Sequence, residues 1–360
     1  MDKRVRIIDA NFNRTREGLR VIEDGIRFYL ENEEIFKKIK DFRHKFIKEV
    51  IKNFPIVFLH KTRESSYDVG KNYDVKGKEN IKKIIEKNCL RVEEGIRVIE
   101  EYSKCIDGKI SSIFHDLRFE FYNLEKQITM LTSRKRIPLP FVYAIINLED
   151  SKNIFNITEE IIKGKVDVIQ FRYKGENIKY FVDIAKKLKK IIPDEIIYII
   201  NDRVDICEIV DADGVHLGDR DISVEDARKV IPDKIIGVST NSLEEVLKYK
   251  GKDIDYLAIG AIYPSPTKKG RKVVGTTIIK DIKKKINIPL VAIGGINKEN
   301  VNEVIKEGAD GVALISSIEK AKNKEEYLKQ IKKKVKKEWM KINKKTNSRK
   351  YNKVSLYFPS

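Results

Sequence analysis

The chain has 360 residues, of which 41% are hydrophobic and 36% are charged, and its formal net charge at pH 7 is +19. This length and composition predict two folded domains and exclude a mainly disordered chain. Cys89, Cys105 and Cys207 are too few and too far apart for a disulfide framework or a zinc site. We expect a reducing, cytoplasmic location, because the sequence also lacks a signal-peptide core and an apolar run long enough to span a membrane.

The first third of the chain contains one pattern twice. Residues 11–23 read NFNRTREGLRVIE and residues 88–100 read NCLRVEEGIRVIE, at an offset of 77 residues. A second pair of segments, 41–46 and 116–121, recurs at an offset of 75, so each copy contains two helices. Apolar residues at helical spacing predict that residues 1–134 form an all-α bundle of amphipathic helices.

Gly18 and Gly95 occupy the same place in the two copies, inside otherwise helical patterns. Glycine costs about 1 kcal/mol relative to alanine in a helix, so its presence in both copies indicates a need for a small residue. Close helix crossing is one explanation. The other is an anion or ligand site between the copies, lined by Arg14, Arg20, Arg91 and Arg97. No role for this domain follows from the sequence.

A charged linker with two prolines, residues 132–140, separates the helical bundle from a C-terminal part of different texture. Short apolar runs alternate there with amphipathic helices, which is typical of parallel βα units. The runs are Phe141–Asn147, Asp167–Tyr173, Ile196–Asp202, Gly214–Leu217, Ile235–Thr240, Tyr256–Tyr263, Leu290–Asn297 and Gly311–Ile318. They favour an α/β (β/α)8 TIM barrel over residues 135–325, with an open doubly wound sheet as the alternative. Residues 326–360 are expected to form a basic helical extension with a loose tail.

Polar residues cluster where the predicted strands end, which is where barrel enzymes place their reactive groups. In the second strand Gln170, Arg172 and Lys174 alternate with apolar residues and therefore share one face. Two cations and an amide on the inner face of a barrel suit a phosphate or diphosphate. An exposed edge strand would show the same alternation.

Carboxylates follow two neighbouring strands. Asp202 ends the third strand, and Asp219 and Asp221 lie in the loop after the fourth. One or two carboxylates, together with substrate phosphate oxygens, are the usual ligands of Mg²⁺. Asp and Asn also cap helices, so the spacing alone leaves both interpretations open.

Four further strand ends favour phosphate binding. The fifth strand ends in Ser239 and Thr240, and the sixth runs into residues 264–270, where prolines shape a loop that carries Lys268. The seventh and eighth runs carry Gly295 and Ser316 near their ends, where backbone N–H groups can form an anion nest. Two anion sites in one barrel mouth indicate two phosphorylated substrates.

Six segments at these strand ends, taken in order, resemble the motif series of thiamine-phosphate synthases. The segments are Gln170–Lys174, Asn201–Arg203, Ala212–Gly218, Gly237–Thr240, Pro264–Lys269 and Val291–Ile296. The resemblance covers residues 141 to about 320 and implies a transferase of thiamine biosynthesis. Such an enzyme joins hydroxymethylpyrimidine diphosphate to thiazole phosphate and releases thiamine phosphate and diphosphate.

The resemblance also implies roles for individual residues. The implied ligands of the pyrimidine diphosphate are Gln170, Arg172, Lys174, Asn201, Ser239 and Lys268, and the implied catalytic groups among them are Arg172, Lys174, Lys268 and Ser239. The implied ligands of the thiazole phosphate are Ser265, Thr267, Gly295, Ile315 and Ser316. Asp202 and Asp221 would bind the Mg²⁺ cofactor. The implied chemistry is neutralisation of the leaving diphosphate, which needs no side-chain nucleophile.

Two positions depart from the family pattern. Asp219 replaces the usual Gln, which leaves open whether Asp219 joins or replaces Asp221 as a metal ligand, and Asn241 replaces the usual His. Two other classes are alternatives: a TenI-type relative without synthase activity, and a basic RNA-binding protein. The complete diphosphate set argues against the first, and the lack of aromatics among the basic residues argues against the second. The expected partners are phosphorylated small molecules, with neither nucleic acid nor a membrane. Homo-oligomer formation is left open.

Overall fold

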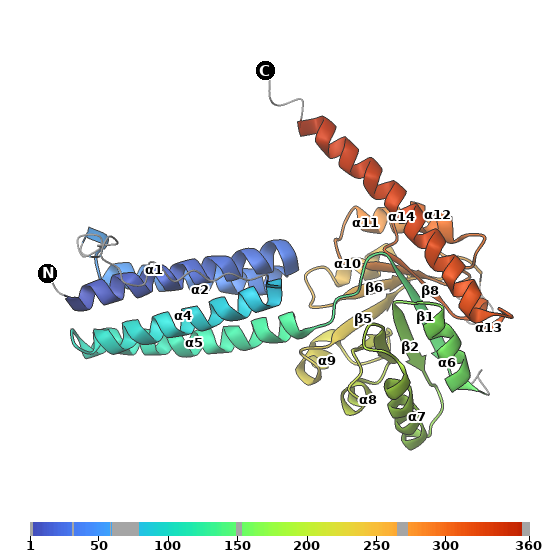
Figure 1. Cartoon of the computed structure of the whole chain (residues 1–360), viewed down its shortest axis with the longest axis horizontal. Coiled ribbons are helices and arrows are strands. Elements are labelled where there is room, and N and C mark those ends of the chain that lie inside the picture. The colour runs from blue at the N-terminus through green and yellow to red at the C-terminus, as the bar shows by residue number, and fades with distance from the viewer. Residues whose placement is uncertain are drawn as a thin grey trace. The chain divides into compact units, whose positions relative to one another are not determined.

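The computed structural model describes residues 3–30, 32–57, 59, 79–148, 153–264 and 273–354, with side chains up to residue 342. The chain divides into two compact units, Met1–Ser133 and Arg134–Ser360 (Figure 1). The buried apolar residues of the helical unit form one cluster, and those of the second unit form two others. None of the described helices combines the length and the apolar character that crossing a membrane requires.

The N-terminal unit is all-α, as the duplicated pattern predicts. Its helices are α1 (Lys3–Asp24), α2 (Glu33–Asn53), α4 (Ile81–Ser103) and α5 (Gly108–Ser133), and a π-helical segment, η1 (Gly25–Leu30), follows α1. The first copy of the repeat forms α1 and α2, and the second copy forms α4 and α5. Asn32 and Asn80 cap the starts of α2 and α4, because each side chain accepts a hydrogen bond from a backbone N–H three residues later.

The two copies pack reciprocally where α1 meets α4. A methyl group on Gly18 would lie 3.0 Å from Val92 Cγ2, and one on Gly95 would lie 2.1 Å from Thr15 Oγ1. Val92 is the counterpart of Thr15 at the repeat offset of 77 residues. Each glycine therefore faces the same place on the other copy, and close packing explains why both copies carry one.

A buried ion pair also occurs once in each copy. Arg43 Nε donates to Glu23 Oε2 at 2.6 Å, and Arg118 Nε donates to Glu100 Oε2 at 2.7 Å. The two glutamate side chains are 3% and 4% exposed, so removing either arginine would leave a buried carboxyl group without its cross-helix partner. The pairs join α1 to α2 and α4 to α5, and they hold each copy together.

The arginines of the alternative ligand-site hypothesis are mostly engaged on their own helices. Arg20 and Arg97 form ion pairs with acidic residues three and four positions later, and Arg91 donates to Asn88. These contacts are the ordinary side-chain pairs of a helix surface. They support the packing explanation for the repeat.

The C-terminal unit is a closed barrel of eight parallel strands in chain order, with β8 paired to β1. The strands are β1 (Phe141–Asn147), β2 (Val168–Arg172), β3 (Ile197–Asn201), β4 (Gly214–Leu217), β5 (Ile235–Thr240), β6 (Tyr256–Ile259), β7 (Leu290–Ile293) and β8 (Gly311–Leu314). The helices are α6 (Ile154–Lys163), α7 (Ile178–Ile191), α8 (Val204–Ile209), α9 (Val224–Val230), α10 (Leu243–Lys248), α11 (Thr277–Lys283), α12 (Val301–Lys306), α13 (Ser316–Glu319) and α14 (Lys324–Val354). The predicted TIM barrel is confirmed, and the open-sheet alternative is wrong.

The last three strands are shorter than predicted and end at Ile259, Ile293 and Leu314. Gly294 and Gly295 follow β7 with φ of 98° and 67°, a backbone conformation that ends an extended strand. The residues after β8 turn into α13 at Ser316. The apolar runs continue past these points because loops that line a barrel mouth also bury apolar side chains.

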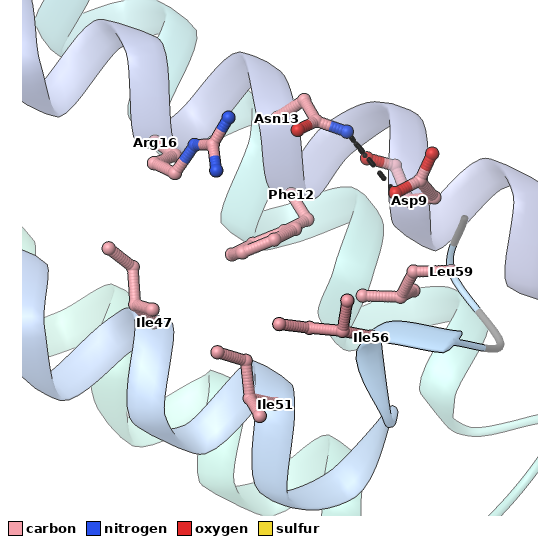
Figure 2. A pocket seen from close by; sticks show the side chains of 8 residues that line it. All are labelled: Asp9, Phe12, Asn13, Arg16, Ile47, Ile51, Ile56 and Leu59. Carbon is pink, nitrogen blue, oxygen red and sulfur yellow. Dashed lines mark hydrogen bonds between the residues drawn. The ribbon is translucent and has the colours of Figure 1, made fainter. Parts of the chain in front are cut away.

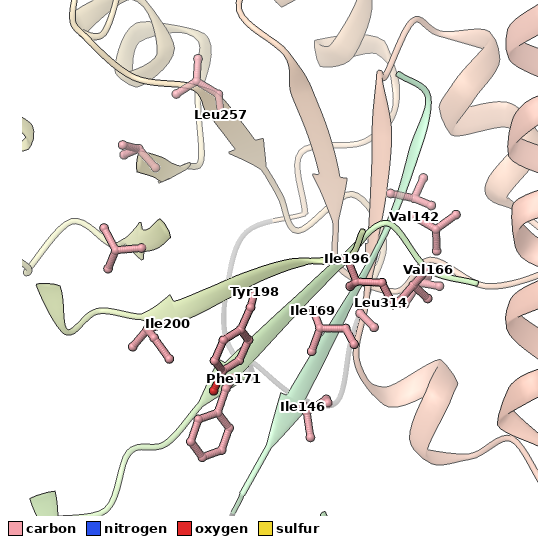
Figure 3. Packing of buried hydrophobic residues seen from close by; sticks show 14 of the residues in the cluster. Val142, Ile146, Val166, Ile169, Phe171, Ile196, Tyr198, Ile200, Leu257 and Leu314 are labelled. Carbon is pink, nitrogen blue, oxygen red and sulfur yellow. The ribbon is translucent and has the colours of Figure 1, made fainter. Parts of the chain in front are cut away.

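Side chains of the strands alternate between the barrel interior and the surrounding helices. Ile169 and Phe171 of β2 belong to the outer apolar cluster, together with residues of β3 (Figure 3). Val168 belongs to the inner cluster. Gln170 and Arg172 therefore share the interior face that the sequence alternation predicts. An exposed edge strand is excluded, because β2 is paired on both sides.

Candidate active site

The carboxyl ends of the strands surround a cavity of about 600 Å³. Its apolar lining consists of Ile145, Ile293 and Ile315. The rest of its lining consists of Gln170, Arg172, Lys174, Asn201, Asp202, His216, Gly218, Asp219, Arg220, Asp221, Ser239 and Asn241. This end of a TIM barrel is where such enzymes bind substrates and carry out chemistry.

Gln170 and Asn201 form a buried amide pair in the cavity wall. Gln170 Nε2 donates to Asn201 Oδ1 at 2.6 Å. Asn201 Nδ2 is buried and has no hydrogen-bond partner among the residues that the structure describes. Because an unpaired buried donor costs about 1–3 kcal/mol, this amide is suited to donate to an acceptor on a bound molecule.

Arg172 and Lys174 bring positive charge to the same side of the cavity. Arg172 Nη1 donates to Asn147 Oδ1 of β1 at 3.1 Å, which fixes the guanidinium at the end of the strand pair. Lys174 forms an ion pair with Asp202 and is about half exposed. A guanidinium and an ammonium at a barrel mouth are well suited to hold a diphosphate.

Asp202 and Asp221 are the carboxylates that the structure brings together. Their side chains share a hydrogen bond, and the pKa of Asp221 is raised by burial and by the neighbouring charge of Asp202. The Gly218 N–H donates to Asp221 Oδ2 at 2.6 Å and fixes its orientation. Asp202 has a φ of 64°, a left-handed conformation that is rare outside glycine and often marks functional sites. Asp219 lines the same cavity, but Asp221 is the partner of Asp202.

This pair of carboxylates fits a divalent cation that is bound together with phosphate oxygens. Two carboxylates held side by side repel each other, and a cation between them would relieve that repulsion. The described part of the chain contains no group of three or more His, Cys, Asp or Glu residues that would hold a metal unaided. A cation at this place would need further oxygen ligands, of the kind that phosphate groups provide.

Ser239, the second-last residue of β5, lies at the boundary between the cavity and the barrel interior. Its Oγ lies 2.8 Å from His216 Nε2. His216 belongs to one of the six sequence motifs, but no role was predicted for it. Since Val215 and Leu217 face the helices, alternation along β4 places His216 inside the barrel, and this signal was available in the sequence.

The residues expected to bind thiazole phosphate are described only in part. Ile315 lines the cavity directly before α13, and Ser316 is the first residue of that helix. A methyl group on Gly295 would lie 2.6 Å from the Pro264 carbonyl oxygen, so only glycine fits there. Two of these residues, Ser265 and Thr267, lie outside the described residues, and so does Lys268.

A smaller cavity of about 140 Å³ lies in the helical unit (Figure 2). Its lining consists of Asp9, Phe12, Asn13, Arg16, Ile47, Ile51, Ile56 and Leu59. Asn13 Nδ2 donates to Asp9 Oδ1 at 3.2 Å, and the Arg16 guanidinium lies 5.7 Å from the centre of the Phe12 ring. This cavity was not predicted, although Asp9, Asn13 and Arg16 recur at helical spacing on α1.

The closed barrel with cations and paired carboxylates at its mouth defines an enzyme class, the TIM-barrel enzymes that act on phosphorylated compounds. The family model for thiamine monophosphate synthase matches residues 142–318, and the model for the ThiD2 family matches residues 6–127. The chain belongs to the thiamine-phosphate synthase family and is a transferase of thiamine biosynthesis. The family and the activity implied by the sequence motifs are confirmed.

Relatives named thiamine-phosphate synthase cover both units of this chain. Thiamine-phosphate synthase from Prochlorococcus marinus subsp. pastoris is 37% identical over 332 residues, which are 87% of this chain and 90% of the relative. The enzyme from Synechocystis sp. is 34% identical and covers 88% of this chain and 92% of its own. The structure of thiamine phosphate pyrophosphorylase from Pyrococcus furiosus has 34% identity and a TM-score of 0.52, and it covers 55% of this chain and 96% of its own. The Prochlorococcus and Synechocystis relatives therefore include a counterpart of the helical unit. Almost the whole Pyrococcus chain, in contrast, matches only about half of this chain.

Proposed function

We propose that the barrel cavity condenses hydroxymethylpyrimidine diphosphate with thiazole phosphate, with Mg²⁺ as cofactor. The observation that carries the proposal is the meeting of Arg172 and Lys174 with the Asp202–Asp221 pair in one cavity. Cations and paired carboxylates at one place are what a magnesium diphosphate requires. The amide pair of Gln170 and Asn201 beside them supplies directional hydrogen bonds for the pyrimidine half.

The reaction is proposed to begin with loss of the diphosphate. The bond between the pyrimidine methylene carbon and the diphosphate oxygen breaks, and its electron pair leaves with the diphosphate. Arg172, Lys174 and Lys268 neutralise the growing negative charge. Asp202 and Asp221 would hold Mg²⁺, which would supply further neutralisation of the leaving diphosphate.

The second half of the reaction forms the new bond. The aminopyrimidine ring stabilises the cation left on the methylene carbon, and the thiazole nitrogen donates its electron pair to that carbon. Ser239 contacts the pyrimidine diphosphate. The thiazole phosphate is proposed to bind through Ser265, Thr267, Gly295, Ile315 and Ser316. Catalysis then consists of charge stabilisation and positioning, without a covalent enzyme intermediate.

The proposal predicts a strict requirement for Mg²⁺ and for the two paired carboxylates. Purified protein should form thiamine phosphate from both precursors with Mg²⁺ and should lose this activity in excess chelator. Asp202→Asn and Asp221→Asn should each lower kcat/KM by about 100-fold or more, because metal charge stabilisation is worth several kcal/mol.

Asp219→Asn is the matched control, since Asp219 lines the same cavity without being the hydrogen-bond partner of Asp202. It should retain activity within about threefold of the parent. Equal activity of the parent in excess chelator would refute the metal role. A larger loss for Asp219→Asn than for Asp221→Asn would assign the metal to the other carboxylate.

A further inference from the structure

A continuous chain of hydrogen bonds runs from Ser239 into the closed interior of the barrel. Ser239 Oγ lies 2.8 Å from His216 Nε2, and His216 Nδ1 lies 2.9 Å from the Tyr256 hydroxyl. The Tyr256 hydroxyl lies 2.8 Å from that of Tyr143. These side chains come from β5, β4, β6 and β1, so the chain crosses the whole barrel. We call it the Tyr–His–Ser chain.

The Tyr–His–Ser chain is buried at its inner end. Tyr143 and Tyr256 are 1% and 0% exposed, and burial raises the pKa of both phenols, so both remain protonated. The backbone makes room for this arrangement, because a methyl group on Gly237 would lie 1.9 Å from the Tyr256 ring. The Tyr256 ring also stacks on His216, with ring centres 5.6 Å apart and planes inclined by 24°. The stacked ring and the hydroxyl of Tyr256 thus fix the position and orientation of the His216 ring.

The buried end of the Tyr–His–Ser chain determines which group donates in each of its hydrogen bonds. Among the described residues, the Tyr143 hydroxyl has no hydrogen-bond partner other than Tyr256, so Tyr143 must donate to Tyr256. The alternative would leave a buried O–H unpaired, at a cost of about 1–3 kcal/mol. The Tyr256 oxygen accepts this hydrogen bond, and the Tyr256 O–H donates to His216 Nδ1.

The direction of these bonds selects one tautomer of the imidazole. With Nδ1 accepting from Tyr256, a neutral His216 carries its proton on Nε2 and donates it to Ser239 Oγ. A doubly protonated ring would leave the Tyr256 hydroxyl proton without an acceptor. Ser239 accepts from His216, and its own O–H is left to point into the cavity.

We propose that Tyr256 and Tyr143 are positioning residues that hold His216 in the Nε2–H tautomer and thereby commit Ser239 to donate its hydroxyl proton to the substrate. The acceptor is a ring nitrogen or a diphosphate oxygen of the pyrimidine substrate, so this inference rests on the proposed contact between Ser239 and that substrate. Without the phenols, the imidazole can carry its proton on Nδ1 instead. Its Nε2 then accepts a hydrogen bond from the Ser239 hydroxyl, which no longer donates into the cavity.

The test is Tyr256→Phe in the full-length protein, because this substitution keeps the ring and removes only the hydroxyl. The tautomer of His216 is measured by ¹⁵N NMR of histidine-labelled protein without substrates, which is practicable since the chain has four histidines. The parent should show the Nε2–H tautomer, and Tyr256→Phe should show a mixture. Its kcat should fall by about 10- to 100-fold while KM changes by less than about threefold, because the lost interaction acts in the transition state.

Tyr198→Phe is the matched control. Tyr198 is equally buried, but its hydroxyl lies 3.2 Å from the Ala185 carbonyl oxygen in the outer cluster, away from the Tyr–His–Ser chain. This variant should keep the parental tautomer and kcat. In a Ser239→Ala background, Tyr256→Phe should cause no further loss, since both act through one hydroxyl.

Tyr143→Phe gives a second, milder variant. Tyr256 can still donate to His216 in it, so the tautomer should be kept and kcat should fall less than in Tyr256→Phe. The inference is overturned if the parent shows the Nδ1–H tautomer, or if Tyr256→Phe matches Tyr198→Phe in both tautomer and kcat. The NMR measurement needs no substrate, so it still tests the tautomer if the synthase assay shows no activity.

Discussion

Glu93 and Glu125 are carboxyl groups from neighbouring helices, α4 and α5, that share a hydrogen bond. The pKa of Glu93 is raised to about 8, first by burial and then by its hydrogen bond to Glu125 and by the charge of Glu125. A carboxyl whose pKa is raised on folding binds a proton more tightly in the folded state. It therefore destabilises the fold as pH rises from its ordinary value of 4.5 to about 8.

Glu93→Gln should remove this pH dependence. At pH 5 the variant and the parent should be similarly stable, and at pH 9 the variant should be more stable by about 1 kcal/mol, a value lowered by solvent screening. Urea unfolding followed by far-UV circular dichroism measures the difference, while fluorescence of the single tryptophan, Trp339, reports the barrel unit separately. Glu17→Gln, an exposed change on α1, is the control. An unchanged pH dependence in Glu93→Gln would contradict this account of the pair.

The polar residues of the cavity could be predicted from the sequence, whereas the pair of buried tyrosines behind His216 could not. Gln170 and Arg172 interrupt an apolar strand at every second residue, which is a strong signal. Tyr143 and Tyr256 lie in apolar runs, where a tyrosine is indistinguishable from an ordinary core residue. Their pairing joins β1 to β6 across the barrel, a contact that depends on ring closure and that periodicity along one strand does not contain.

At the scale of elements, the packing of α1 on α4 depends on small residues. A methyl group on Gly95 would come within 2.1 Å of Thr15 Oγ1, a buried atom that has no hydrogen-bond partner among the described residues. The gain in helix propensity from alanine, about 1 kcal/mol, is smaller than the cost of forcing two helices apart.

Gly95→Ala should destabilise the helical unit by about 1–3 kcal/mol. Hydrogen exchange of the α1 and α4 amides measures the effect locally. Gly108→Ala is the matched control, because a methyl group on Gly108 meets nothing within 4 Å. Adding Thr15→Ala to Gly95→Ala should restore much of the stability by removing the clashing hydroxyl. Equal protection in Gly95→Ala and Gly108→Ala would argue against close packing at this point.

The sequence predicted the identity and order of the elements better than their ends. The two-residue and helical periodicities of the apolar residues located the eight strands and the paired helices of each repeat. The ends of β6, β7 and β8 were placed too late, because the apolar pattern continues beyond the last ladder hydrogen bond. Backbone geometry, such as the positive φ of Gly294 and Gly295, ends a strand, and hydropathy does not record it.

At the scale of the whole molecule, the buried apolar residues of the helical unit and of the barrel form separate clusters. Each unit therefore has its own core, which is the physical requirement for folding alone. Every described residue of the proposed active site lies in the barrel. Arg134, the first residue of that unit, donates to Asp253 at 2.6 Å and belongs to the barrel rather than to a free linker.

A chain that begins at Arg134 should fold and synthesise thiamine phosphate with kcat/KM within about threefold of the full chain. Steady-state assays of both proteins measure this, and Trp339 fluorescence confirms that the shortened chain is folded. A folded but inactive barrel would show that the helical unit takes part in the chemistry. A shortened chain starting at Val142 is the control and should be less stable, because it lacks the Arg134 contacts and the first residue of β1.

The reciprocal packing of Gly18 and Gly95 gives the helical unit an internal symmetry. Gly18 faces Val92, and Gly95 faces Thr15, the residue that corresponds to Val92 in the first copy. The two copies therefore face each other as identical subunits do in a twofold-symmetric dimer. Because both copies lie in one chain, their sequences can differ at equivalent positions: Glu93 stands where the first copy has Arg16.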